Sequence, residues 1–249
     1  MRRWFLLLSI AAWLVAIIAP ADVPTITEFP VPTAGSQPYS IALGPDGNLW
    51  FTEAAAGKVA KLTPTGSFTE FSIPTASGEA PTMWRSPQGI IAGPDGNLWF
   101  TERICNKIWK VTPAGSFAGF SIPTANSQPL AITAGRDGRL WFTEVESMQI
   151  GTVTLAGSFT EFPIPTRGQP MMITAGPDGN LWFTEFFRAA EKIGKLTSTG
   201  SFTEFSIPTG NSVAHGITTG PDGTVWFTEA GAGKIGRVNL SSVARRGSQ

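Results

Sequence analysis

His215 is the only histidine in this chain, and its position pairs it with one carboxylate. His215 and Glu229 lie at equal distances on either side of Asp222, the centre of a predicted turn, so we expect them to face each other across a hairpin. An imidazole usually titrates near neutral pH, so His215 could act as a general base, with Glu229 orienting it or binding a metal ion. A lone histidine in a β-rich chain is also often a hydrogen-bonded structural residue. The sequence keeps both interpretations open.

The hairpin around Asp222 is one of five similar hairpins. Each carries Leu/Val-Trp-Phe-Thr-Glu, with the tryptophan at Trp50, Trp99, Trp141, Trp182 and Trp226. Counting equal distances from the turn aspartate of each hairpin pairs a different residue with each of the other repeat glutamates: Tyr39 with Glu53, Gln88 with Glu102, Leu130 with Glu144 and Met171 with Glu185. We expect these varied residues around one mouth of a central channel, where they are the better candidates for function. The invariant glutamates are expected to be architectural, bound to a backbone amide or to the lysine five residues on.

Repeats spaced by 49, 42, 41 and 44 residues are typical of a repeat architecture. Each unit reads as four short strands, the first two joined by a Gly-x-Asp-Gly turn. The fifth unit lacks its last strand, and Ile26–Pro32 at the other end of the chain matches that strand. We therefore predict an all-β protein, a β-propeller over residues 22–240 with five four-stranded blades closed by the N-terminal strand. An incomplete larger ring is the alternative, and the matching strands at the two ends argue against it.

The two ends of the chain predict segments outside the propeller. Arg2 and Arg3 precede the apolar run Trp4–Ile18, so residues 1–21 predict a secretory signal peptide that is cleaved after Ala21. The protein is then expected to be secreted or periplasmic, or membrane-anchored if the peptide stays uncleaved, and to have no membrane contact after cleavage. Residues 241–249 are expected to form a disordered tail.

Composition narrows the expected partners. Eighteen basic and eighteen acidic residues balance, and no basic stripe is present, so we expect no nucleic-acid binding. Cys105 is the only cysteine, which leaves no internal disulfide. We expect a monomer that binds a small molecule or a peptide.

Two loops on the predicted channel face are longer than their counterparts. One carries Trp84 and Arg85, and the other carries Phe186 and Phe187. Tyr39 and Met171 occupy a position at which the residue type differs from blade to blade. Together with them, these side chains form a candidate ligand-binding surface. Rings that simply cap the blade core would give the same pattern, and both interpretations stay open.

The repeat unit itself resembles a known family. Gly-Pro-Asp-Gly-Asn-Leu-Trp-Phe-Thr-Glu, then Lys-Ile-Gly-Lys-Leu-Thr and Phe-Thr-Glu-Phe-x-Ile-Pro-Thr, is similar to the repeat of the streptogramin B lyases (virginiamycin B lyases) over the whole predicted propeller. The resemblance implies a propeller, usually of seven blades, that acts in the cytoplasm on cyclic depsipeptide antibiotics. It also implies opening of the ring by elimination at the ester, with histidines and a Mg²⁺ ion held by acidic residues.

This chain has only some of the site residues that the resemblance implies. His215 fits the catalytic histidine of the last blade, whereas Met171 stands where the preceding blade should supply a second histidine. Val213 stands at one expected acidic position, and Glu229 lies close to the other. Glu229 and a neighbouring Glu185 are the candidate ligands for Mg²⁺, which takes oxygen ligands including one or two carboxylates.

Two functions are therefore expected from the sequence. The first is a lyase of streptogramin B lyase type, of use in antibiotic resistance in that family, with His215 and Glu229 as catalytic residues. The second is a secreted propeller without chemistry that binds a ligand or protein on its loop face.

Overall fold

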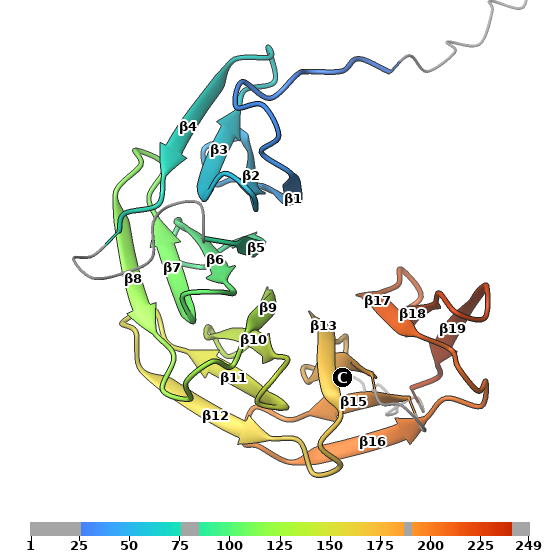
Figure 1. The fold of residues 1–249 in the computed structure, drawn as a ribbon. Helices are drawn as coiled ribbons and strands as arrows, with labels where there is room; N and C mark the ends of the chain where they lie inside the picture. Colours follow the sequence, from blue (N-terminus) through green and yellow to red (C-terminus); the bar gives the residue numbers. More distant parts are fainter. Residues whose placement is uncertain (1–25, 76–84, 187–190, 241–249) are drawn as a thin grey trace, which may run out of the picture. The chain divides into compact units, whose positions relative to one another are not determined.

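The computed structural model describes residues 26–75, 85–186 and 191–240. It separates into two parts, residues 1–30 and residues 31–249, and all nineteen strands of the described residues belong to the second part (Figure 1). The predicted signal peptide and C-terminal tail lie outside the described residues. Within those residues, no helix has the length and hydropathy needed to span a bilayer.

The strands form five antiparallel sheets, here called blades 1 to 5 in chain order. Blade 1 contains β1 (Pro38–Leu43), β2 (Leu49–Glu53), β3 (Lys58–Leu62) and β4 (Phe68–Ser72). Blade 2 contains β5 (Pro87–Ala92), β6 (Leu98–Glu102), β7 (Lys107–Val111) and β8 (Phe117–Ser121). Blade 3 contains β9 (Pro129–Ala134), β10 (Leu140–Glu144), β11 (Gln149–Val153) and β12 (Phe159–Pro163). Blade 4 contains β13 (Gln169–Ala175), β14 (Leu181–Phe186), β15 (Lys192–Leu196) and β16 (Phe202–Ser206).

Blade 5 contains β17 (Ala214–Thr219), β18 (Val225–Glu229) and β19 (Lys234–Val238). It has three strands in the described part of the chain, whereas the other four blades have four. Residues 26–31 belong to no strand. The propeller of five blades is thus confirmed, and its closure by Ile26–Pro32 stays a prediction.

The turn between the first two strands of each blade forms because an aspartate organises it. In blade 1 the Asp46 carboxylate accepts hydrogen bonds from the Asn48 amide and from the Trp50 indole at 3.0 Å, while Gly47 takes a positive φ of 75°. The four other tryptophans of the motif are held in the same way by Asp95, Asp137, Asp178 and Asp222. Burial alone would raise the pKa of Asp46, but the bonds from Asn48 and Trp50 outweigh it and lower the pKa. The turn therefore fixes each indole and keeps its aspartate ionised.

In blades 1 to 4 the tryptophan then anchors its own blade to the next. In blade 1, Trp50 stacks on Phe71 of the fourth strand with ring centroids 5.4 Å apart, and blades 2 to 4 repeat this pair. Phe71 also covers Gly115 in the last turn of blade 2, where a Cβ atom would come within 2.3 Å of the ring. Gly115 has φ +90°, so both the backbone and the close approach require glycine at this turn.

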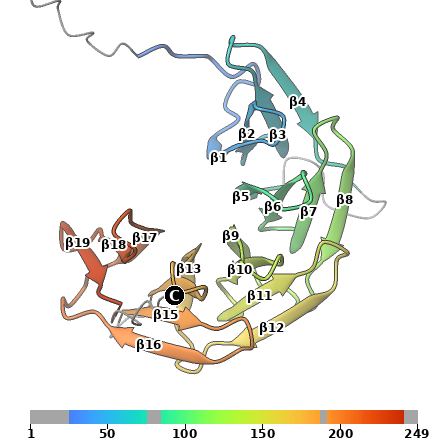
Figure 2. The ribbon, with the colours of Figure 1, turned by 180° about the vertical axis from the view of Figure 1, so that it is seen from behind.

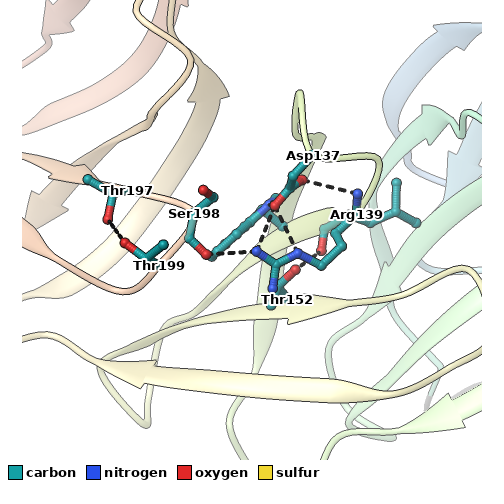
Figure 3. Close-up of polar contacts among 8 residues, drawn as sticks. Asp137, Arg139, Thr152, Thr197, Ser198 and Thr199 are labelled. Atoms are coloured by element: carbon teal, nitrogen blue, oxygen red, sulfur yellow. Dashed lines mark hydrogen bonds and ion pairs between the residues drawn. The ribbon is translucent and has the colours of Figure 1, made fainter.

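Polar contacts add to the packing between blades. Arg139 of blade 3 replaces the asparagine of the turns in blades 1, 2 and 4 and lies 4.8 Å from the Trp141 ring. Its guanidinium donates to the Asp137 carboxylate and, at 2.8 Å, to the Ser198 carbonyl in the last turn of blade 4 (Figure 3). In blade 1, Lys61 makes the corresponding contact with the Pro113 carbonyl of blade 2. A side chain of the first turn in blade 3 and one of β3 in blade 1 thus contact the last turn of the next blade.

Candidate functional site

The innermost strand of every blade contains a β-bulge at the varied position. In blade 5, Ala214 lies opposite Glu229 and Ile217 opposite Phe227, so His215 and Gly216 together face the single residue Thr228. The four other blades show the same shift. The predicted pairs His215–Glu229, Tyr39–Glu53, Gln88–Glu102, Leu130–Glu144 and Met171–Glu185 are therefore wrong by one residue. The extra residue of the bulge thus moves His215 out of register with Glu229, the repeat glutamate of blade 5.

The threonine of the repeat motif holds this bulge and links it to the next blade. In blade 1, the Thr52 hydroxyl accepts from the Ser40 amide and donates at 2.7 Å to the Gln88 carbonyl of blade 2. The same relay runs through Thr101, Thr143 and Thr184, which donate to the carbonyls of Leu130, Met171 and His215. The backbone of each varied residue is thus fixed by the preceding blade, while its side chain takes no part in the relay.

A cavity of about 420 Å³ lies between the inner strands of all five blades, and the two ribbon views show these strands around one space (Figures 1 and 2). Ile90, Ile132, Ile173 and Ile217 supply much of its apolar wall. The polar side chains of the lining belong to Tyr39, Ser40 and His215. A cavity of this size with few polar groups has the character of a small-molecule site.

The five varied residues reach this cavity unequally. Tyr39, Leu130 and His215 line it, with Tyr39 and His215 exposed. Gln88 is buried, and its amide donates to the Ser86 hydroxyl. In blade 4 the cavity is lined by Met172, whereas the predicted residue Met171 is absent from the lining. Three of the five varied residues therefore line the cavity, Gln88 does not, and in blade 4 the neighbouring Met172 takes the place of Met171.

The repeat glutamates lie inside the blades and are buried. In blades 1 and 4 the prediction that they pair with the lysine five residues on is wrong, because that lysine bonds a different glutamate on the fourth strand. Lys58 lies 2.7 Å from Glu70 in blade 1, and Lys192 lies 3.6 Å from Glu204 in blade 4. In these two blades the lysine is thus directed to the fourth strand rather than to the repeat glutamate.

Three of these buried glutamates have raised pKa values, and for Glu53 burial is the main cause. Burial, followed by repulsion from Glu204, raises the pKa of Glu185 from 4.5 to about 8, although Thr166 donates to it at 3.2 Å. Burial, followed by repulsion from Glu161, raises the pKa of Glu144 to about 7. At neutral pH the Glu185 carboxyl therefore carries a proton, which makes it a hydrogen-bonded structural group.

In blade 2 a buried cation, Arg85, pairs with the repeat glutamate, Glu102. The Arg85 guanidinium binds both oxygens of Glu102 at 2.9 and 2.8 Å, and the Trp109 indole donates to the same carboxylate. Arg85 is 1% exposed, so its predicted role on the ligand surface is wrong. The fourth strand of this blade has Gly119 where blade 1 has Glu70, and a Cβ atom at Gly119 would come within 2.8 Å of the Trp109 ring.

The predicted metal ligands do not make a Mg²⁺ site. Glu229 is buried in blade 5 with one oxygen lacking a hydrogen-bond partner, and Glu185 is buried in blade 4 beside Glu204. The described residues contain no group of three histidine, cysteine or acidic side chains that could hold a metal ion. A protonated carboxyl is also a poor ligand for a hard cation.

The two predicted loop surfaces are described only in part. Phe186 ends β14 and is 36% exposed, but it does not line the central cavity. Trp84 and Phe187 lie outside the described residues. Ser40 and Met172 are cavity residues that the sequence reasoning missed, because each is the second residue of a bulge that has no sequence signal of its own.

Comparisons with known proteins agree with this geometry. The curated virginiamycin B lyase of Bordetella bronchiseptica is 40% identical over 58 residues, which cover 23% of this chain and 19% of the relative. The virginiamycin B lyase of Saccharopolyspora erythraea is 48% identical over 44 residues, 18% of this chain and 15% of the relative. The chain thus matches less than a fifth of the length of these curated relatives.

Solved structures match over much more of the chain. Virginiamycin B lyase from Staphylococcus aureus superposes with a TM-score of 0.80 at 41% identity, covering 87% of this chain and 71% of that one. A catalytically inactive histidine-to-alanine variant of the Staphylococcus aureus enzyme, with quinupristin, gives 0.79 at 41% identity over 88% of this chain and 71% of that one. The sequence profile of the virginiamycin B lyase family matches residues 24–245. This chain therefore belongs to the virginiamycin B lyase family.

Proposed function

We propose that this protein is a carbon–oxygen lyase that opens a cyclic depsipeptide of the streptogramin B class, or a related cyclic ester, by elimination. The observation that carries the proposal is the position of His215. Its bulge exposes the imidazole at the wall of the central cavity, while Thr184 of blade 4 binds its carbonyl at 2.9 Å and fixes its backbone. A positioned base at the edge of an apolar cavity is the first requirement for removing a carbon-bound proton.

The reaction would follow from that base. His215 takes the proton on the carbon next to a carbonyl of the substrate, and the electron pair left behind forms a carbon–carbon double bond. The bond from the β-carbon to the ester oxygen breaks, so that oxygen leaves with its electron pair as part of a carboxylate. No water is consumed, and the linear product is an isomer of the cyclic substrate.

Polar groups of the cavity lining would stabilise the negative charge that develops during the reaction. Tyr39 and Ser40 carry the other polar side-chain groups of the lining, and either hydroxyl could donate a hydrogen bond to the enolate oxygen or to the leaving carboxylate. The isoleucines of the wall exclude water from these bonds and so strengthen them. Glu229 belongs to the glutamate row behind the bulge, where it would support β17 and have no contact with substrate.

The test is incubation of the purified protein with a type B streptogramin, with and without Mg²⁺. Because elimination leaves the mass unchanged, the product must be separated chromatographically and identified by its fragmentation as a linear chain. Hydrolysis would instead add the mass of one water. His215→Ala should abolish turnover at unchanged melting temperature, and Glu53→Gln in blade 1 serves as the matched control because it changes the repeat glutamate of another blade and leaves His215 in place.

A second function is supported by the composition of the cavity wall. Three polar side chains among mainly apolar ones suit retention of a ligand without chemistry. If wild type leaves the antibiotic intact under both conditions yet binds it in calorimetry, and His215→Ala weakens this binding, the protein is a binding propeller. The expected location outside the cytoplasm stays part of this proposal, and secretion of a tagged full-length chain would test it.

A further inference from the structure

A second cavity, here called the Arg103 pocket, lies between the loops of blades 2 and 3. It has a volume of about 350 Å³, and its described lining consists of Ser86, Arg103, Ile104, Asn126 and Gln128. Ser86 directly precedes β5, and Gln128 directly precedes β9. The neighbouring strands β5 and β9 then run on to Gly89 and Leu130 in the wall of the central cavity (Figures 1 and 2). A strand rises about 3.3 Å per residue, so the two cavities lie about 10 Å apart along these strands.

Arg103 is a cation at a position that is uncharged in the other blades. It directly follows the repeat glutamate, where the other blades have Ala54, Val145, Phe186 and Ala230. Its backbone amide donates to the Ser86 carbonyl at 3.1 Å, and the equivalent amides of blades 1, 3 and 5 make the corresponding bond. The loop is therefore held by its backbone, and the guanidinium of Arg103 is an addition to the shared architecture.

The half-buried guanidinium of Arg103 is oriented by a neutral group. Its Nε and Nη2 atoms donate to the Gln128 Oε1 atom at 2.9 and 2.6 Å. The adjacent carboxylate of Glu102 is already bound through both oxygens by Arg85. Among the described residues, Arg103 has no acidic partner, and its Nη1 atom has no hydrogen bond. The pocket therefore contains a positioned cation whose charge no described side chain neutralises.

The other polar groups of the pocket can also donate hydrogen bonds. The Ser86 hydroxyl accepts from the Gln88 amide at 2.7 Å, so its own proton is available to a ligand. Gln128 uses its oxygen for Arg103, which leaves its NH₂ group as a donor. The described lining contains no acidic side chain, and its apolar member, Ile104, is 54% exposed. One cation, several neutral donors and an apolar surface suit a singly charged oxyanion attached to an apolar group.

We propose that the Arg103 pocket binds the carboxylate of a peptide-like ligand. The remaining N–H groups of Arg103 and the Ser86 hydroxyl donate to the two carboxylate oxygens, and an apolar side chain of the ligand packs on Ile104. A carboxylate fits better than a phosphate, because one guanidinium balances its single charge and Ile104 provides no further donor. The rest of such a ligand can extend along β5 and β9 into the central cavity. This site is separate from His215 and does not rest on lyase activity.

The test uses two probes that differ in one group. N-acetyl-leucine carries a carboxylate beside an apolar side chain, and N-acetyl-leucinamide has the same shape without the charge. Calorimetric titration should give wild type at least about tenfold higher affinity for the acid, the loss expected when a charge-assisted bond is removed. Arg103→Gln should abolish this preference. Arg136→Gln removes an exposed arginine from the first turn of blade 3 and should leave the preference unchanged.

Two further variants locate the probe within the molecule. Ile104→Ser changes an exposed side chain that no part of the core needs, and it should weaken the binding of both probes about equally. His215→Ala should bind N-acetyl-leucine as wild type does, whereas a loss of binding there would assign the carboxylate to the central cavity and overturn the proposal. Equal affinity of wild type for the two probes, a preference that survives Arg103→Gln, or unchanged binding in Ile104→Ser would also overturn it. Streptogramin turnover has no part in this test, so its failure would leave the lyase proposal standing.

Discussion

Replacing Glu185 with glutamine should stabilise the protein in mildly alkaline solution and reduce the pH dependence of its stability. The Glu185 carboxyl is buried in blade 4 beside Glu204 and Thr166, and its pKa rises from 4.5 to about 8. Between these two values the folded protein holds a proton that the unfolded chain has released. The free energy of unfolding therefore falls as pH rises through this window.

The magnitude follows from the width of the window. One pKa unit corresponds to about 1.4 kcal/mol, so this one site should lower the free energy of unfolding by about 1.4 kcal/mol per pH unit between about pH 5 and pH 8. For a chain of this size, the melting temperature should fall by about 3–5 °C per unit. Glutamine keeps the shape and the hydrogen bonding of the protonated acid, so Glu185→Gln should remove this contribution and melt higher than wild type at pH 8.

The assay is a series of thermal melts, followed by circular dichroism, across that pH range. Glu146→Gln controls for net charge, because Glu146 is exposed in the loop that follows β10 of blade 3. Glu102→Gln provides a contrast at the equivalent repeat position, since it removes the carboxylate charge that the buried Arg85 guanidinium binds and should destabilise by about 3–5 kcal/mol throughout. Parallel pH profiles for Glu185→Gln and wild type would refute the reasoning.

Three other changes test single contacts. Gln149→Lys should place an ammonium group beside Glu161, as Lys58 lies beside Glu70, and so lower the pKa of Glu144 and flatten the pH dependence of the melting temperature below about pH 7. Arg139→Ala should cost about 1 kcal/mol in urea unfolding by losing the Ser198 contact and the Trp141 stack, whereas Arg136→Ala, an exposed neighbour, should cost little. His215→Gln should remove turnover without any change in melting temperature, because the hydrogen bond from Thr184 that anchors the residue is accepted by its carbonyl, which glutamine also provides; activity in this variant would exclude His215 as the base.

Much of the fold could be predicted because its determinants are local and repeated. The turn aspartate, the tryptophan that it holds and the paired phenylalanine recur at fixed spacings, so the blades and their number follow from the sequence. The partner of each repeat glutamate could not be predicted. Lys58 lies beside Glu53 in register, but a long flexible side chain can turn to either neighbouring strand, and only packing directs it to Glu70.

The candidate site was less accessible to sequence reasoning, because its geometry depends on one extra residue in every innermost strand. Pairing residues at equal distances from the turn assumes that each residue has one partner across the hairpin. A bulge that occurs in all five blades leaves the spacings between the repeats unchanged, so the sequence does not reveal it. The same bulge explains why these positions differ so widely. The threonine relay binds the backbone of Leu130, Met171 and His215 through their carbonyls, which any residue provides. Since folding makes no demand on the side chain there, it is free to serve a ligand, and this makes His215 a better candidate for function than the invariant glutamate behind it.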